Sequence, residues 1–258
     1  MICDIISLRL KTFYFIVTIK DKPFEAVYQK STLITPKPNT NILGGKLIMT
    51  ELNKKITALT FDDGPDVTLT NLVLDRLDKF KVSATFMVVG QRINNSTSSV
   101  IKRMVNSGHE LGNHSWGYSS MGDMSAEEIK ESVSKTTAAI ELYSGTSPKF
   151  FRAPNLVYSK ELYDNVDLVF AHGITADDWV QTTTAQQRAD AIIRQIGDGA
   201  IILLHDVQPL PHPTPEALDI IIPKLQDQGY EFVTLSELFL RRGLDLSTSK
   251  GKAYSFVP

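Results

Sequence analysis

Two adjacent aspartates, Asp62 and Asp63, follow an apolar run and precede a Gly-Pro turn. The run, residues 56–61, has the composition of a buried strand, on which successive side chains point to opposite faces. At the end of a strand the side chains splay, so both carboxylates can face one pocket. One could hold a cation while the other takes a proton. For this stretch taken alone, solvated carboxylates in an ordinary Asp-Gly turn are the alternative.

Polar residues also follow other strand-like apolar runs along the chain. From residue 55 onward such runs alternate with helical patterns, which predicts a parallel sheet in an α/β fold. About seven units fit a closed (β/α) barrel better than an open sheet. The carboxyl ends of barrel strands share one face, where active sites form. We therefore expect one rim to carry Asp62, Asp63, His114, Arg152, Asp178, Trp179, His205 and Asp206.

The helices between these strands are marked by spacing and by end signals. Apolar residues at helical spacing predict a helix over residues 69–80 and another that stops at Gly108. Ser125 and Glu128 form a capping box that begins a helix running to about residue 143. Further helices are expected over residues 184–196 and 236–241. Another runs to residue 228, with Thr214 as its N-cap and proline next.

Asp63 and His114 are suited to hold a divalent metal. A carboxylate with an imidazole fits zinc, cobalt or nickel, and zinc or cobalt is the cofactor we expect. The single cysteine, Cys3, excludes a cysteine-rich zinc site and internal disulfides. A site without thiolates indicates a catalytic metal with open water positions.

Four other side chains suit acid–base work around such a metal. Asp62 could take a proton from a metal-activated water, and Arg152 could pair with this base and hold its charge. His205 would protonate the leaving group. Asp178, if it lies near His205, would raise the pKa of that histidine.

Substrate contacts are expected from neighbouring residues. Trp179 and Leu203 could wall an apolar pocket for a small acyl group. A backbone N–H near Asn155 could stabilise an oxyanion. Trp116 could stack on a sugar ring or belong to the core.

Taken in order, five motifs resemble those of the polysaccharide deacetylases, also called the NodB-homology or carbohydrate esterase family 4 domain. The resemblance covers about residues 53–242 and implies a distorted (β/α) barrel, usually of seven strands. It also implies metal-dependent removal of acetyl groups from sugars. Carried over, Asp62 is the base, Asp63 and His114 are metal ligands, and His205 is the acid. The motifs are TFDDGP (60–65), GHELGNHSW (108–116), FRAPN (151–155), DDW (177–179) and ILLHD (202–206).

Two positions depart from the family pattern. The second motif of the family ends in another histidine four residues after His114, where this chain has Tyr118. A neutral phenol is a poor zinc ligand, so we expect weaker metal binding, with water or a weak Tyr118 contact as third ligand. Residues 152–156 read RAPNL instead of RPPYG, which removes a tyrosine from the usual sugar-facing wall. The acetylxylan esterase branch is the expected home for such variation.

Composition sets the remaining expectations. The net charge of −2 gives no basic surface for nucleic acid, and no stretch is long enough to span a membrane. Residues 1–48 read as an N-terminal extension or linker without a clear signal peptide, and residues 49–258 as the catalytic domain. Residues 31–45 are rich in proline, asparagine and glycine, which is typical of a linker.

The sequence thus predicts a metal-dependent esterase or deacetylase of acetylated xylan, secreted and monomeric. An N-deacetylase of chitin or peptidoglycan sugars is the alternative. A catalytically weakened carbohydrate-binding homologue, or an amidohydrolase of small molecules, would be the reading from another class. The presence of both a base, Asp62, and an acid, His205, favours an enzyme.

Overall fold

The computed structural model describes residues 13–19, 22–28 and 54–258 of the chain. The chain divides into two compact units, Met1–Leu52 and Asn53–Pro258. In the first unit, β1 (Phe13–Ile19) and β2 (Lys22–Tyr28) pair as an antiparallel hairpin. The expected linker, residues 31–45, lies outside the described residues.

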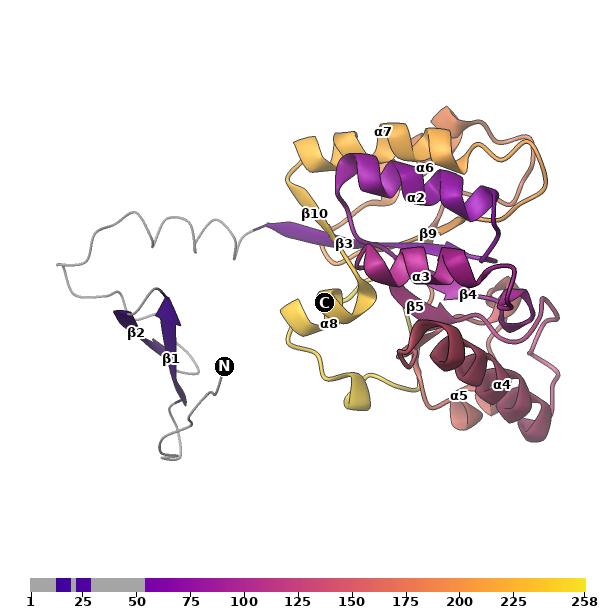
Figure 1. The fold of residues 1–258 in the computed structure, drawn as a ribbon, viewed down its shortest axis with the longest axis horizontal. Helices are drawn as coiled ribbons and strands as arrows, with labels where there is room; N and C mark the ends of the chain where they lie inside the picture. Colours follow the sequence, from indigo (N-terminus) through magenta and orange to yellow (C-terminus); the bar gives the residue numbers. More distant parts are fainter. Residues whose placement is uncertain (1–12, 20–21, 29–53) are drawn as a thin grey trace. The chain divides into compact units, whose positions relative to one another are not determined.

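The second unit is built on a sheet whose central strand is β3 (Lys55–Asp62) (Figure 1). One edge of β3 pairs with β9, and the other pairs first with β10 and then with β4. All strand pairs of this sheet are parallel, which confirms the predicted parallel (β/α) barrel. The strands joined to β3 are β4 (Thr85–Val88), β5 (Glu110–Asn113), β6 (Phe150–Phe151), β7 (Val169–Ala171), β8 (Ile174–Thr175), β9 (Ile201–His205), β10 (Tyr230–Val233) and β11 (Ala253–Tyr254).

The C-terminal residues connect two distant strands of this sheet. β11 pairs with β7 at one end of the strand order, and the residues after β11 return to the start of β9. The Ile201 N–H donates to the Ser255 carbonyl at 2.9 Å, and the Val257 N–H donates to the Gly199 carbonyl at 2.8 Å. The sequence did not predict β11, because a strand of two residues carries no readable period.

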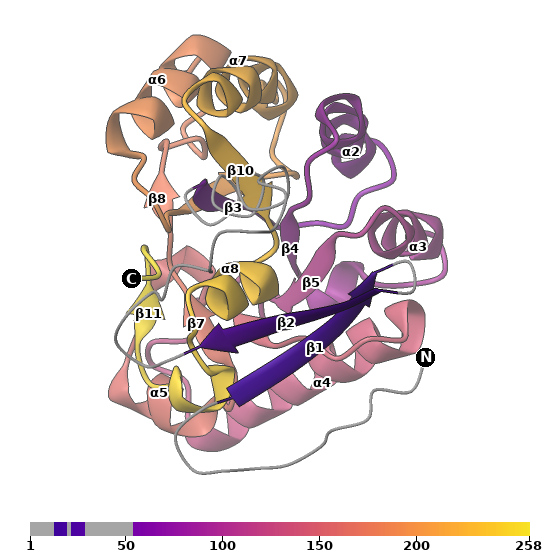
Figure 2. The ribbon, with the colours of Figure 1, turned by 90° about the vertical axis from the view of Figure 1, so that its left-hand side faces the viewer.

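Helices surround the strands on the outside (Figure 2). Each of these helices contacts the next one around the sheet, in the order α6, α7, α2, α3, α4 and α5. The predicted capping box at Ser125 is present, and Thr184 and Gln187 form a second one. Thr214 was expected as an N-cap but is the first helical residue, with Pro213 at the cap. The helices are α2 (Leu69–Phe80), α3 (Ser98–Asn106), α4 (Ala126–Ser144), α5 (Lys160–Asn165), α6 (Ala185–Gln195) and α7 (Thr214–Asp227).

Side chains of each strand alternate between two apolar clusters. On β3, Leu59 and Phe61 pack in the cluster that contains the helix side chains of α2 and α7. Ile56 and Ala58 point the opposite way, into a second cluster on the inner face of the barrel. Thr60 and Asp62 share the parity of Ala58, so Asp62 ends the inner face of its strand.

The other barrel strands follow the same alternation. Ile201 on β9 and Phe150 on β6 belong to the inner cluster. On β5, a Cβ added at Gly112 would meet the inner side chain of Met87 at 2.4 Å. His205, Arg152 and His114 are an even number of residues beyond these inner positions. Their parity therefore directs them to the inside of the rim.

The final helix, α8 (Leu235–Arg241), covers the opposite end of the barrel. The Leu235 N–H donates to the Thr85 hydroxyl at 3.0 Å, and the Ser236 N–H donates to the Glu110 carboxylate at 2.9 Å. Thr85 and Glu110 begin β4 and β5. Leu238 and other α8 side chains complete the inner cluster. The helix thus packs beneath the inner face, and the carboxyl ends of the strands lie at the other end.

Candidate active site

A pocket of about 410 Å³ lies at the carboxyl ends of the strands, and we call it the catalytic pocket. It brings together most of the side chains that the sequence singled out. Arg152 and Asp178, also predicted, are fully buried and contact residues of the pocket. The predicted residues that line it are Asp62, Asp63, His114, Tyr118, Asn155, Trp179, Leu203 and His205.

Asp62 is buried and ion-paired. The Arg152 Nη1 donates to its Oδ1 at 2.5 Å, and the Arg152 Nε donates to the Ala171 carbonyl at 3.0 Å. Burial by itself raises the pKa of Asp62, but the charges of Arg152, His114 and His205 lower it below the usual value overall. Asp62 is therefore ionised at neutral pH, which a general base requires.

Asp63 reaches the pocket by leaving the strand conformation. It is one residue past the end of β3 and has a φ of 81°, in the left-handed region that aspartate tolerates better than most residues. A regular strand would direct it away from Asp62. Instead, its Oδ1 lies 3.6 Å from the His114 Nε2, and the Asp62 Oδ2 lies 3.7 Å from the same nitrogen. Burial raises the pKa of Asp63 above its usual value, against the lowering effect of the His114 charge.

His114 presents its Nε2 to these carboxylates. Its Nδ1 lies 2.8 Å from the Arg152 carbonyl oxygen. A carbonyl only accepts, so Nδ1 carries a proton, and Nε2 is the nitrogen that can coordinate an ion. This arrangement is the usual support of a metal-binding histidine.

The Asp63–His114 pair fits a divalent cation. The separation of 3.6 Å is too long for a hydrogen bond, yet close to the spacing of two ligands that share an ion through bonds of about 2.1 Å. Among the described residues, no three histidine, cysteine or acidic side chains are grouped so as to hold an ion. The donor set is therefore a pair of protein ligands and suits a metal with open positions.

Tyr118 occupies the position where the family pattern has a histidine. Its hydroxyl accepts a hydrogen bond from the Arg92 Nε and lies 3.4 Å from the Asp63 carbonyl oxygen. Burial raises the pKa of Tyr118, so the phenol stays neutral. The side chain is 42% exposed. Tyr118 therefore lies at the edge of the pocket, held by Arg92, and adds no imidazole to the donor pair.

His205 is held by a buried carboxylate. Its Nδ1 donates to the Asp178 Oδ1 at 2.9 Å, and its backbone N–H donates to the Asp178 Oδ2 at 2.7 Å. Burial lowers the pKa of His205, but Asp178, Asp62 and Asp63 more than offset this and raise it to about 9. The ring is therefore protonated at neutral pH and can donate from Nε2.

Asp206 has a structural role beneath the site. Its Oδ1 accepts from the Gly64 N–H at 3.0 Å, and its Oδ2 accepts from the Thr70 hydroxyl. A Cβ at Gly64 would lie 2.2 Å from the Asp206 Oδ2, so only glycine fits there. This contact fixes the turn after Asp62 and Asp63.

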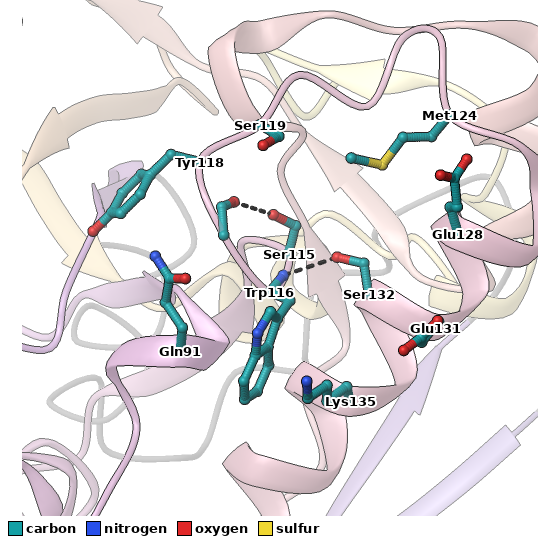
Figure 3. Close-up of a pocket in the computed structure, with 11 residues that line it drawn as sticks. Gln91, Ser115, Trp116, Tyr118, Ser119, Met124, Glu128, Glu131, Ser132 and Lys135 are labelled. Atoms are coloured by element: carbon teal, nitrogen blue, oxygen red, sulfur yellow. Dashed lines mark hydrogen bonds between the residues drawn. The ribbon is translucent and has the colours of Figure 1, made fainter.

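The expected substrate residues fall into two places. Trp179, 49% exposed, stands edge-on to the His205 ring at 6.2 Å between centroids, and Leu203 lies in the same pocket. The Asn155 Nδ2 donates to the Tyr118 carbonyl at 3.3 Å. Trp116 does not line the catalytic pocket but a neighbouring one (Figure 3).

Arg188 is a buried residue near the site that the sequence analysis missed. Its Nη1 lies 4.0 Å from the Asp178 Oδ2 and donates to Gln208 and Thr214, each at 2.9 Å. Arg188 is fully buried on the inward face of α6, next to the apolar Ala189. A charged residue on the apolar face of an expected helix was the available signal.

The pocket of this parallel (β/α) barrel contains an ionised aspartate, a protonated histidine and a carboxylate–imidazole pair. These groups are the ones that a hydrolase uses to attack a carbonyl group with water. Comparison with known proteins gives the same result. Residues 50–176 match the family model described as polysaccharide deacetylase. The chain belongs to this family, carbohydrate esterase family 4.

The relatives include enzymes of two substrate classes. A bifunctional xylanase/deacetylase of Pseudobutyrivibrio xylanivorans is 44% identical over 75% of this chain and 32% of its own length. A peptidoglycan-N-acetylmuramic acid deacetylase of Bacillus subtilis is 33% identical over 90% of this chain and 49% of its own length. The chain thus spans about a third of the first of these curated relatives and about half of the second.

One solved structure is matched along its entire length by this chain. It is a family 4 acetyl xylan esterase from Clostridium thermocellum, in complex with a cobalt ion. Sequence identity is 62% and the TM-score is 0.78, over 79% of this chain and all of that one. Enzymes of this family are metal dependent and act on acetylated polysaccharides. Among the described residues, no helix combines the length and apolar character needed to cross a bilayer.

Proposed function

We propose that this protein is a metal-dependent esterase that removes acetyl groups from xylan. The observation that carries the proposal is the opposite ionisation of two groups in one pocket. The pKa of Asp62, buried but paired with Arg152, is lowered, and the pKa of His205, buried but paired with Asp178, is raised to about 9. Groups with pKa values separated in this way mark the base and the acid of an active site.

In this reaction Asp62 acts as the base and His205 as the acid. Asp62, kept ionised and oriented by Arg152, takes a proton from the attacking water. His205, kept protonated by Asp178, gives a proton to the departing sugar oxygen. A zinc or cobalt ion, when bound by Asp63 and His114, supplies positive charge beside the acetyl carbonyl and the water.

The remaining pocket residues suit a small acyl group. Leu203 and Trp179 provide apolar surface beside His205. We place the acetyl methyl group against these two side chains. The backbone at Asn155, with a φ of 56°, lines the same pocket, and its N–H is our candidate donor to the oxyanion.

Acetate release tests the function. The protein is incubated with acetylated xylan, chitin oligomers and peptidoglycan, with chelator and after adding cobalt or zinc. We expect release from xylan that chelator abolishes and metal restores. Asp63→Ala should lose this response, whereas Asp123→Ala, which removes an exposed carboxylate outside the catalytic pocket, should keep it. Undiminished hydrolysis by Asp63→Ala would refute the metal role.

Two rivals have specific support. The Bacillus subtilis relative is named as a peptidoglycan deacetylase, so release from peptidoglycan but not xylan would favour N-deacetylation. Tyr118 leaves a donor pair in place of a triad, so oligosaccharide binding without acetate at any metal concentration would favour a weakened, binding homologue. We also propose that the protein acts as a monomer outside the cell, where such polymers occur; cell fractionation and light scattering test this.

A further inference from the structure

A second pocket of about 680 Å³, drawn in Figure 3, shares the lining residue Tyr118 with the catalytic pocket. It lies between helix α4 and the loop that follows β5, and we call it the α4 pocket. Tyr118 lines both pockets, so the two are neighbours at this residue. The volume is in the range of about 300–1,000 Å³ that is usual for ligand sites.

Polar side chains in the α4 pocket have hydrogen-bonding capacity to spare. Gln91, Ser119, Glu131 and Lys135 contribute an amide, a hydroxyl, a carboxylate and an ammonium group to its lining. Within the described part of the chain, the carboxylate of Glu131 and the ammonium of Lys135 make no hydrogen bond or ion pair. Instead, the Lys135 Nζ lies over the ring of Trp116, 4.0 Å from the ring centroid.

Trp116 forms the apolar wall of the α4 pocket. Its backbone N–H donates to the Ser132 hydroxyl at 2.9 Å, which fixes the loop against α4. A Cβ at Gly90 would lie 2.5 Å from the indole Cε3, so Trp116 also packs tightly on that residue. With Lys135 over the ring, a ligand meets the indole together with an ammonium group. The sequence left Trp116 as either a sugar-stacking residue or a core residue, and in the structure its ring packs against Gly90 and lies beneath the Lys135 ammonium.

The charges of the lining decide the class of ligand. Glu128 and Glu131 face a single cation, Lys135, so the α4 pocket disfavours an anionic ligand. The Glu128 Oε2 is occupied by Ser125 of the helix cap, at 2.8 Å. What is left includes the Glu131 carboxylate, the Lys135 ammonium, the Gln91 amide, the Ser119 hydroxyl and the Trp116 indole. Such a set suits hydroxyl groups, which donate and accept, on a ring with an apolar face.

We propose that the α4 pocket binds an uncharged pyranose unit of the same polysaccharide chain whose acetylated unit occupies the catalytic pocket. This inference rests on the proposed function for the occupant of the catalytic pocket. The chain passes Tyr118, which lines both pockets. Lys135 and Glu131 bind hydroxyl groups, and Trp116 contacts the sugar ring. The α4 pocket thereby makes the protein prefer long substrates over single sugars.

Trp116 itself reports on binding, because the chain has only two tryptophans. In Trp179→Phe protein, the remaining indole fluorescence comes from the α4 pocket. We expect this emission to change on titration with β-1,4-xylohexaose or cellohexaose, and the two arms distinguish xylan-type from glucan-type chains. Adding Lys135→Ala should weaken binding about 5- to 10-fold, the loss of one typical hydrogen bond.

Lys130→Ala is the matched control, since Lys130 is an exposed lysine of α4 outside the pocket lining. It should leave the affinity unchanged. An emission that neither oligosaccharide changes, or equal weakening by both lysine variants, would overturn the proposal. Tighter binding of a glucuronic-acid-bearing xylohexaose than of plain xylohexaose would overturn the assignment to an uncharged unit.

Kinetics separates this inference from the proposed function. In protein with both tryptophans, Lys135→Ala should raise KM for acetylated xylohexaose about 5- to 10-fold and leave kcat/KM for 4-nitrophenyl acetate unchanged. An unchanged KM for the hexamer would refute the role of the α4 pocket. If the unaltered protein releases acetate from neither compound, the proposed function fails, and the fluorescence titration still decides the sugar site.

Discussion

Replacing Asp178 with asparagine should move the alkaline limb of the pH–activity profile to lower pH. Asp178 is fully buried and receives two hydrogen bonds from His205, one from Nδ1 at 2.9 Å and one from the backbone N–H at 2.7 Å. Burial alone lowers the pKa of His205, and Asp178 provides the largest opposing effect, which raises it to about 9. Asparagine keeps the size of the side chain and an oxygen for the N–H but removes the charge.

The size of the effect follows from these values. With a pKa of about 9, about 97% of His205 is protonated near pH 7.5. In Asp178→Asn we expect a pKa of about 6.5 or lower, which leaves about 9% or less protonated. If His205 is the acid, kcat/KM falls about tenfold near pH 7.5 from this cause alone. The loss should shrink as the pH falls towards about 5.5, where the ring is protonated again.

The assay is the pH profile of kcat/KM for acetate release, with the unaltered protein and Asp177→Asn as controls. Asp177 is the adjacent, exposed carboxylate, so its variant removes the same formal charge away from the ring. The alkaline limb should lie near pH 9 in both controls and move to about 6.5 or below in Asp178→Asn. An alkaline limb that stays in place, or a loss of equal size at acid and alkaline pH, would refute the assignment of His205 as the acid.

The raised pKa of His205 also makes the free energy of unfolding depend on pH. The pKa of His205 is raised in the folded protein, so its contribution is fully present below the unfolded value of about 6.5. It is lost as the pH rises through about 9. A rise of about 2.5 units corresponds to about 3 kcal/mol. Urea unfolding across this window should show a steeper loss of stability for the unaltered protein than for Asp178→Asn.

Three further substitutions test the site. Tyr118→His should complete a three-ligand set and tighten cobalt binding at least about tenfold by calorimetry, and an unchanged affinity would contradict the donor-pair reading. Gly64→Ala should lower stability by about 1–3 kcal/mol in urea, because its Cβ would lie 2.2 Å from the Asp206 Oδ2, and an unaltered midpoint would count against that contact. Arg152→Met should cost about 3–5 kcal/mol at neutral pH by leaving Asp62 charged and unpaired. That loss should shrink as acid protonates the carboxylate, and a pH-independent loss would show that packing, not charge, is responsible.

The sequence allowed much of the rim to be predicted for a simple physical reason. Strand alternation and parallel pairing are local rules, and together they direct Asp62, His114, Arg152 and His205 to one end and one face of a barrel. The structure confirms the barrel and brings these residues into contact or into one pocket. The strand β11 escaped prediction because its two residues carry no readable period.

The same rules fail where contacts between distant segments decide the outcome. Alternation alone would turn Asp63 away from Asp62, and only the folded loop, with its φ of 81°, brings it to His114. The sequence left Trp116 as either a sugar-stacking residue of the active site or a core residue. The packing of Trp116 on Gly90 and Lys135 places it in the α4 pocket instead.

The residue types, and the strand ends that carry them, were determined by the sequence alone, because hydrophobic period and turn chemistry act over a few neighbours. Which nitrogen of His114 carries the proton, why His205 is charged, and where Lys135 meets Trp116 were decided by the tertiary structure. Each depends on burial and on partners 19 to 38 positions away along the chain, as with the Arg152 carbonyl and Asp178. Electrostatic environment is a property of the packed chain, and local sequence does not encode it.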